Sequence, residues 1–184
     1  MLQVVTLKDG AFVALRPAWP SDLPRLERMY YRLSSQSIYY RLFVGAPHVP
    51  HWASRFAAIS ANTTPTSAAL VAVVGREVIG TARFDREAAD GSAEVGIVVE
   101  DAWQGRGLGR HLLRRLAREA LLQDITTFTA RTLAENQRAL RLFKGTFAGT
   151  HVTFDQGEYA LCAPLLPAPV ADPSHLVTAR QAHC

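Results

Sequence analysis

The feature that most constrains this chain is the stretch of residues 92–121, SAEVGIVVEDAWQGRGLGRHLLRRLAREAL. β-Branched residues predict a strand over residues 93–99, and apolar residues at helical spacing predict a helix over residues 108–121. Between them, glycines at positions 105, 107 and 109 let the backbone turn without Cβ clashes and leave N–H groups open to a close approach. The stretch therefore predicts a strand, a glycine-rich loop and a helix in succession.

The start of that helix favours an anion. No Ser, Thr, Asp or Asn stands directly before it, so its first N–H groups lack an obvious partner in the chain. A helix N-terminus carries a partial positive charge, to which Arg106 and Arg110 add full charges. A dinucleotide fingerprint starting at Gly105 would need a glycine in place of Arg110, and the Gly-Lys-Ser/Thr of a P-loop is absent. We therefore expect a phosphate or pyrophosphate bound by some other motif.

The loop follows the pattern Gln/Arg-x-x-Gly-x-Gly/Ala, with Gln104, Gly107 and Gly109 at its defining positions. In this form it resembles the acetyl-CoA-binding motif of the GCN5-related N-acetyltransferases, the GNAT family. A plain glycine-rich turn would account for the glycines alone. The resemblance spans about residues 5–165. It implies a mixed α/β (α+β-like) fold with a predominantly antiparallel sheet of about seven strands, splayed at the central strand, with helices on both faces.

The resemblance implies acetyl-CoA as co-substrate, an amine as acceptor and no metal. A backbone N–H around Val98 or Val99 would polarise the thioester carbonyl. The residues implied to bind the cofactor lie on the central strand, in the loop and on a later helix: Ile97, Val98, Val99, Gln104, Gly105, Arg106, Gly107, Leu108, Gly109, Arg110, Asn136 and Phe143.

A second match begins at Asn136. The family pattern Asn-x-x-Ala-x-x-Leu-Tyr is matched by Asn136, Ala139 and Leu142, and a helix N-cap is the alternative role of the asparagine. Phe143 stands where many family members have a tyrosine that protonates the leaving thiolate, which phenylalanine cannot do. We expect either another acid, with Tyr159 or a water as candidates, or a thiolate that leaves unassisted.

Acetyl transfer to an amine requires a neutral nitrogen. Deprotonating a lysine, whose reference pKa is about 10.4, costs roughly 4.6 kcal/mol at pH 7, so a base near the amine is valuable. Glu94 lies on the central strand, where GNAT enzymes often place a catalytic glutamate, and an exposed charge on an alternating strand is the alternative. Glu100 and Asp101 are weaker candidates because they flank the loop and would oppose an anion there.

Residues 34–43, SSQSIYYRLF, predict a short second helix or a broken turn. Through Ser34, Ser37, Arg41 and Phe43 they resemble the pattern Ser-x-x-Ser-x-x-x-Arg-Phe-Phe, with leucine in place of the first phenylalanine. That pattern occurs in a GNAT subgroup that includes bacterial protein lysine acetyltransferases, where the region borders the acceptor pocket. The resemblance implies a protein lysine as acceptor, with a small-molecule amine second. The alternative is a set of core residues beside a surface arginine.

The rest of the chain suits one domain over residues 1–165, followed by a proline-containing, poorly ordered tail over residues 166–184. Ser21 is the expected N-cap of a helix over residues 22–33. Short connections predict that three successive strands form an antiparallel meander before the glycine-rich loop. The β-rich runs cover residues 3–7, 11–16, 68–74, 78–83, 93–99, 125–132, 151–154 and 158–163.

Composition excludes several classes of protein. The 184 residues, 48% hydrophobic and 20% charged, describe a soluble globular protein. A net charge of +4 favours an anionic ligand, but no basic cluster of nucleic-acid type accompanies it. Two cysteines, no secretory pattern and no apolar run of membrane-spanning length predict a cytoplasmic protein without a membrane partner. His48 and His51 lack the third ligand that zinc requires, so we expect no metal.

Two hypotheses of other classes stay open. An acyl-CoA-binding regulatory module with weak catalysis is favoured by Phe143, whereas Glu94 and the intact loop favour an enzyme. A nucleic-acid-binding protein would use Arg110, Arg114 and Arg118, although an arginine-rich solvent face is the ordinary explanation for that spacing. The acceptor, the acyl chain, any effector and the oligomeric state are left open, with a dimer among the options.

Overall fold

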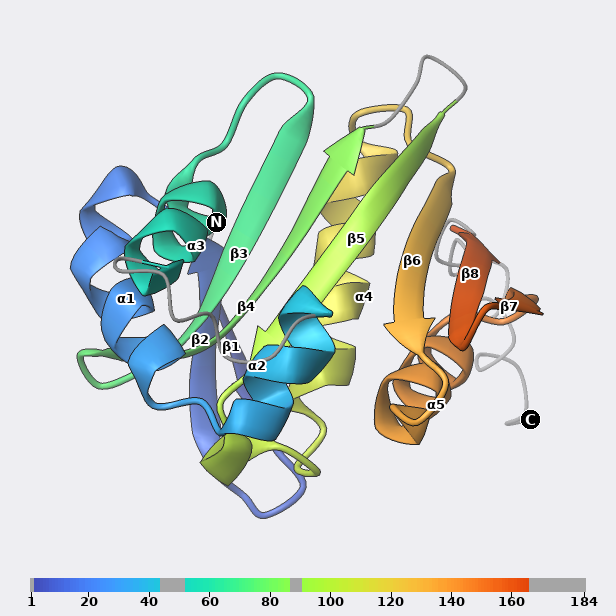
Figure 1. Cartoon of the computed structure of the whole chain (residues 1–184). Helices are drawn as coiled ribbons and strands as arrows, with labels where there is room; N and C mark the ends of the chain where they lie inside the picture. The colour runs from blue at the N-terminus through green and yellow to red at the C-terminus, as the bar shows by residue number, and fades with distance from the viewer. Residues whose placement is uncertain (1, 44–51, 87–90, 166–184) are drawn as a thin grey trace, which may run out of the picture.

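The computed structural model describes residues 2–43, 52–86 and 91–165, which build an eight-stranded sheet in the order β1-β2-β3-β4-β5-β6-β8-β7 (Figure 1). The strands are β1 (Gln3–Thr6), β2 (Phe12–Pro17), β3 (Ser67–Val74), β4 (Glu77–Arg86), β5 (Ser92–Val99), β6 (Thr127–Leu133), β7 (His151–Asp155) and β8 (Glu158–Pro164). The helices are α1 (Leu23–Tyr31), α2 (Ser35–Leu42), α3 (Trp52–Ala61), α4 (Leu108–Leu121) and α5 (Gln137–Thr146). Two short 3-10 turns complete the described elements, η1 (Pro20–Asp22) and η2 (Asp101–Trp103).

The sheet has eight strands rather than the expected seven or so, because each β-rich run of the sequence forms a strand of its own. Both arms of the first hairpin and both arms of the last belong to the same sheet. Neighbouring strands are antiparallel except for β5 and β6, which pair in parallel. The predominantly antiparallel sheet and the meander of β3, β4 and β5 are therefore confirmed.

The central strands β5 and β6 separate after a short contact. Their parallel pairing runs only from Ser92 opposite Thr127 to Glu94 opposite Thr129, whereas β5 stays paired with β4 as far as Val99. Beyond that contact β6 pairs with β8 alone, and the two central strands diverge in Figure 1. The expected splay at the central strand is confirmed, and it leaves one edge of β5 open to an extended ligand.

Helices cover both faces of the sheet, as expected (Figure 1). On one face, α4 buries Leu108, Leu112 and Leu116, which recur at helical spacing in the larger core. On the other face, α1, α2 and α3 enclose a second core that includes Leu26 and Ile38. Among the described residues, no helix is both long and apolar enough to cross a membrane.

The first helix begins differently from the prediction. Ser21 lies inside η1 and does not cap α1, which follows Asp22 without a side-chain cap. Instead, the buried carboxylate of Asp22 accepts hydrogen bonds from Arg16 at 2.6 and 2.7 Å and from the Trp19 N–H at 2.9 Å. Burial alone would raise the pKa of Asp22, but the hydrogen bonds from Arg16 and Trp19 outweigh burial and hold this pKa below its ordinary value.

Candidate active site

The glycine-rich loop leads into α4 without a side-chain cap, as the sequence predicted. Gly105 and Gly107 have φ values of +77° and +95°, in the left-handed region that favours glycine. Gly107 is the N-cap residue of α4, and no side chain donates or accepts a cap hydrogen bond there. The first N–H groups of α4 are therefore available to an anionic ligand.

A groove of about 1030 Å³ runs beside this loop, between the open edge of β5, helix α2 and the start of α5. Its acidic lining residues are Asp101 and Glu135. Positive charge prevails in the groove, which suits a ligand with several phosphates. The lysine and arginines that line it are Lys8, Arg41, Arg106, Arg110, Arg114, Arg138 and Arg141.

Most of the predicted cofactor residues lie along this groove. They are Ile97, Val98, Val99, Gln104, Gly105, Arg106, Gly107, Gly109, Arg110 and Asn136. Leu108 and Phe143 do not line the groove. Leu108 is 1% exposed and packs in the core, so that only its backbone can meet a ligand. Phe143 is buried too, and its ring packs against Phe147 with centroids 5.2 Å apart.

Two side chains of the loop also bind other parts of the protein. The Gln104 amide donates to the Val99 carbonyl at 2.9 Å and to the Ser37 hydroxyl at 3.1 Å, which joins the loop to β5 and α2. Arg106 pairs with Asp9 at 3.0 Å, so the turn of the first hairpin supports the loop from the other side. These contacts hold the loop in position before any ligand binds.

We expect Gly107→Ala to weaken coenzyme A binding about five- to thirtyfold. A left-handed φ costs an L-residue roughly 1–2 kcal/mol, so the alanine loop relaxes and the ligand must restore the strained form. Gly157→Ala is the matched control, because Gly157 has a φ of +85° with no atom within 4 Å of an added Cβ, but lies in the β7–β8 turn. Calorimetric titration with coenzyme A measures both variants. Unchanged affinity of the Gly107 variant would contradict this role of the loop.

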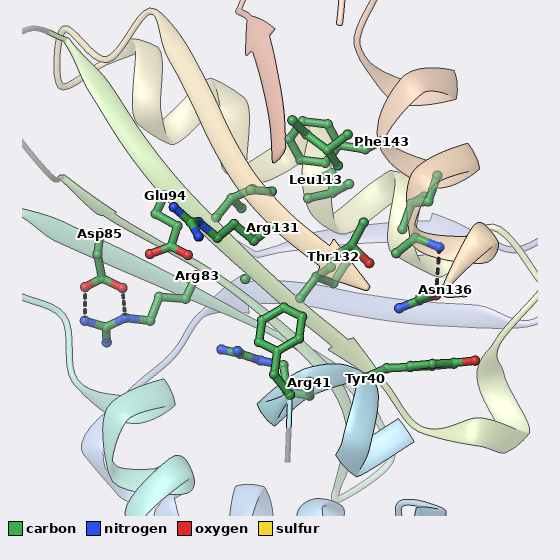
Figure 2. Close-up of a pocket in the computed structure, with 18 residues that line it drawn as sticks. Tyr40, Arg41, Arg83, Asp85, Glu94, Leu113, Arg131, Thr132, Asn136 and Phe143 are labelled. Atoms are coloured by element: carbon green, nitrogen blue, oxygen red, sulfur yellow. Dashed lines mark hydrogen bonds and ion pairs between the residues drawn. The ribbon is translucent and has the colours of Figure 1, made fainter. Parts of the chain in front are cut away.

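A smaller pocket of about 180 Å³, here called the inner pocket, continues from the groove at the gap between β5 and β6. Residues that line both cavities are Tyr40, Arg41, Ile97, Asn136, Ala139 and Leu142. One side of the inner pocket is charged, with Glu94, Arg83 and Asp85, and the other is apolar, with Leu113 and Phe143 (Figure 2). A ligand arm lying along the open edge of β5 would thus end beside a carboxylate.

Glu94 lies on β5 where the pairing with β6 ends, and its exposed side chain lines the inner pocket. Its cross-strand neighbour Asp85 is bound by two nitrogens of Arg83. Figure 2 shows that ion pair and shows no such interaction for Glu94 among the residues drawn. Of the two carboxylates of the pocket, Glu94 is the one free to accept a proton.

The serines of residues 34–43 have a structural role. The Ser34 hydroxyl accepts from the Ser37 N–H at 3.1 Å and so caps α2. Asp101 of η2 accepts from the Ser34 N–H at 2.9 Å and from both hydroxyls at 2.8 Å. Burial would raise the pKa of Asp101, but these hydrogen bonds outweigh burial and lower it. Asp101 therefore anchors α2 beside the loop, and its carboxylate oxygens are already hydrogen-bonded within the protein.

Arg41 and Asn136 border the passage between the two cavities. The Arg41 guanidinium lies over Gly96 of β5, where a Cβ would come within 2.7 Å of its Nη2. The Asn136 Oδ1 accepts from the Ala139 N–H at 3.1 Å, which confirms the N-cap role. Because Asn136 also lines both cavities, the same side chain can cap α5 and contact a ligand.

Sequence reasoning overlooked Tyr40 and Thr132, which both line the inner pocket. Tyr40 lies within the segment compared with the Ser-x-x-Ser pattern, so that match could have indicated it. Thr132 carries no signal, because a β-branched residue in a strand reads as ordinary core. Tyr159, one of the candidate acids considered from the sequence, lines neither cavity, and its ring packs on Phe154 with centroids 5.3 Å apart.

Within residues 2–43, 52–86 and 91–165, no group of three or more His, Cys, Asp or Glu side chains could hold a metal ion. His48 and His51, the histidine pair considered from the sequence, lie outside the described residues. The tail of residues 166–184 also lies outside them.

The fold and the site together define a class of protein. An uncapped helix start and a basic groove suit a phosphorylated ligand, and the open edge of β5 leads an extended arm of that ligand to a free carboxylate. This is the arrangement of an acyltransferase that uses a coenzyme A thioester.

Comparison with known proteins identifies the family. The model of the acetyltransferase (GNAT) family matches residues 26–147. The GNAT domain of S. lividans PAT superposes with a TM-score of 0.80 at 30% identity, over 89% of this chain and 97% of that domain. The chain therefore belongs to the GNAT family of acetyltransferases, whose acyl donor is acetyl-CoA.

Two further proteins are similar to this chain, one in sequence and one in fold. The acetyltransferase Pat of Mycolicibacterium smegmatis is 31% identical over 158 residues, which cover 83% of this chain and 46% of Pat. The chain thus spans about half the length of that curated relative. A putative acetyltransferase from Salmonella typhimurium, solved with its cofactor acetyl-CoA, shares the fold with a TM-score of 0.64 at 20% identity, over 88% of this chain and 98% of that chain.

Proposed function

We propose that this chain transfers the acetyl group of acetyl-CoA directly to a primary amine, with a protein lysine as the favoured acceptor and Glu94 as the base. The observation that carries the proposal is the continuity of the basic groove with an inner pocket that presents an unpaired carboxylate. The phosphates of the cofactor would bind at the loop before α4, and its arm would follow the open edge of β5. The thioester would then end beside Glu94.

The reaction requires little more than positioning and one base. A backbone N–H of Val98 or Val99 would bind the thioester carbonyl oxygen and stabilise the charge that develops on it. Glu94 would take a proton from the acceptor ammonium, whose nitrogen then attacks the carbonyl carbon. No covalent enzyme intermediate is needed.

The mouth of the inner pocket supports a lysine side chain as acceptor. Phe43 and Tyr40 line the pocket that also contains Glu94, and Phe43 is 38% exposed, so apolar rings form part of the wall that an acceptor would meet. A lysine carries its amine on an apolar four-carbon stem, which can pack along such rings while the amine proceeds inward. The similarity of residues 34–43 to the protein lysine acetyltransferase pattern favours the same acceptor.

Thiol release from acetyl-CoA, measured against a panel of acceptors, tests the proposal. Lysine peptides, the same peptides with arginine in place of lysine, and small amines such as amino acids and polyamines form the panel. We expect kcat/KM for the best lysine peptide to exceed that for every small amine by at least about tenfold, which corresponds to about 1.4 kcal/mol of transition-state binding. The arginine peptides should be inactive.

Other outcomes favour other functions. Higher kcat/KM for a small amine would replace the protein acceptor by the small-molecule alternative. Tight coenzyme A binding without turnover of any amine would favour a regulatory module, which the absence of a hydroxyl at Phe143 already suggests as the second candidate. With either function, we propose that the protein is cytoplasmic, because the exposed free thiol of Cys162 suits a reducing compartment.

A further inference from the structure

The hydroxyl of Thr132 is the one buried side-chain polar atom in the described part of the chain that has no hydrogen-bond partner. The residue is 4% exposed. Buried hydroxyls almost always have a hydrogen-bond partner in the protein. Burial removes their hydrogen bonds to water, and leaving these bonds unreplaced costs free energy. An unpaired hydroxyl that lines a pocket therefore indicates an atom of a ligand.

Thr132 faces the apolar side of the inner pocket. Alternate residues of a strand lie on the same face of the sheet. Thr132 therefore lies on the same face of β6 as Phe128 and Ala130, which belong to the core beneath α4 and α5. Phe143 and Leu113 line the same pocket, and Figure 2 shows them beside Thr132, away from Glu94. Phe143 offers no hydrogen-bond donor. Asn136 also lines the pocket, but its Oδ1 caps α5, whereas the Thr132 hydroxyl has no partner among the described residues.

The chemistry of a thioester decides which ligand atom the hydroxyl meets. Thr132 lines the inner pocket but not the groove, whereas Val98 and Val99, along which the arm of the ligand would run, line the groove. Its partner therefore belongs to the reacting end of the ligand and not to the nucleotide or to the amides of the arm. The acyl methyl cannot accept a hydrogen bond, and the carbonyl oxygen is assigned to a backbone N–H of β5. The sulfur is the remaining acceptor, and it gains negative charge as the C–S bond breaks.

We propose that the Thr132 hydroxyl donates a hydrogen bond to the thioester sulfur and stabilises the departing thiolate. The inference rests on the proposed function. It gives the reaction two separate sides, with the base Glu94 near the acceptor and Thr132 near the leaving group. No proton passes from Thr132, because a threonine hydroxyl is a far weaker acid than a thiol.

During the transfer the acceptor nitrogen loses two protons, and coenzyme A gains one. Glu94 takes one proton from the acceptor ammonium and passes it to water, and the neutral nitrogen attacks the carbonyl carbon. When the tetrahedral intermediate collapses, the C–S bonding pair moves to sulfur, and the second nitrogen proton leaves by the same route. Coenzyme A departs as the thiolate, hydrogen-bonded by Thr132, and takes a proton from water.

Thr132→Val, a near-isosteric change, tests the proposal. We expect kcat to fall about tenfold to a hundredfold, which is the range for a hydrogen bond to a charged group. KM for acetyl-CoA should stay within about twofold, because the bond strengthens only as charge develops on sulfur. Thr132→Ser keeps the hydroxyl and should retain most of the activity.

Stability separates this role from a structural one. Valine removes an unpaired hydroxyl, so the melting temperature of Thr132→Val should equal or exceed that of wild type. Thr81→Val is the matched control, because Thr81 is equally buried at 4% but donates to the Leu70 carbonyl at 2.9 Å. The control should lose stability and keep kcat. A Thr132→Val protein that is less stable than wild type, or that keeps full kcat, would overturn the proposal.

A spectroscopic readout is independent of the acceptor. Thiolate absorbance of bound coenzyme A, followed against pH, reports the thiol pKa in the complex, which should lie about one unit higher in Thr132→Val than in wild type. Because no amine is needed, this result tests Thr132 even if every acceptor fails. An equal thiol pKa in the two complexes would show that the hydroxyl does not contact the sulfur.

Discussion

Replacing Glu94 with glutamine should lower kcat for acetyl transfer by about 10²–10⁴-fold, the usual contribution of a general base. Glutamine keeps the size of the side chain and its position on β5, but it cannot accept the proton of the acceptor ammonium. The affinity for coenzyme A should stay within about twofold, because Glu94 lines the inner pocket and not the groove that runs past the loop.

No other carboxylate of the inner pocket is expected to replace Glu94. Asp85 lies opposite it on β4, but two nitrogens of Arg83 bind its oxygens. Protonating Asp85 would break that ion pair. Asp101, in the groove, accepts hydrogen bonds from Ser34 and Ser37, and these bonds anchor α2.

The pH dependence of kcat/KM gives the sharper test. In Glu94→Gln the rate should follow the ionisation of the acceptor alone and rise about tenfold per pH unit toward the lysine pKa of about 10.4. Asp155→Asn, which removes the same charge from an exposed residue of β7, should behave as wild type. Equal rates for Glu94→Gln and wild type at pH 7 would exclude Glu94 as the base.

Replacing Asp22 with asparagine should lower the free energy of unfolding by about 3–5 kcal/mol, because it leaves a buried charge without its partner. Arg16 is 8% exposed and donates two hydrogen bonds to the fully buried Asp22. For a chain of this length the melting temperature should fall by roughly 10 °C. Denaturant unfolding at pH 7 measures the change directly.

Two variants control this result. Glu158→Gln removes a partner 3.9 Å from Arg131, whose side chain is 71% exposed, and should cost less than about 1 kcal/mol. The double change Arg16→Met with Asp22→Leu removes both charges and should recover much of the loss. If Asp22→Asn were as stable as wild type, the buried pair would contribute nothing to the fold.

The contribution of Asp22 to stability should disappear at low pH. The pKa of Asp22 is lowered in the folded protein, so its contribution to stability is complete above the unfolded pKa of about 3.9 and is lost as pH falls through the folded pKa. Asp22→Asn lacks this contribution at every pH. The stability difference between wild type and variant should therefore be greatest near neutrality and shrink below about pH 4.

The strand, loop and helix of residues 92–121 could be predicted because their signals are local. Glycine spacing, the missing cap and the apolar stripe of α4 act within a few residues of one another, and the structure follows them. The start of α1 could not be predicted in the same way. Ser21 has the chemistry of a cap, but Asp22 is drawn into a pair with Arg16 on β2, which a local rule does not consider.

Sequence by itself determined the family, the loop before α4, the position of Glu94 on the central strand and the capping asparagine Asn136, because each depends on spacing along the chain. Only the tertiary structure decided that Ser34 and Ser37 bind Asp101, and that Thr132 lines the inner pocket with its hydroxyl unpaired. The physical reason for the serine contacts is that α2 lies beside η2, which is 64 to 67 residues away in sequence, and the reason for the exposure of Thr132 to the pocket is the divergence of β5 from β6. Where two strands distant in sequence separate, side chains that would read as core or surface come to line a site.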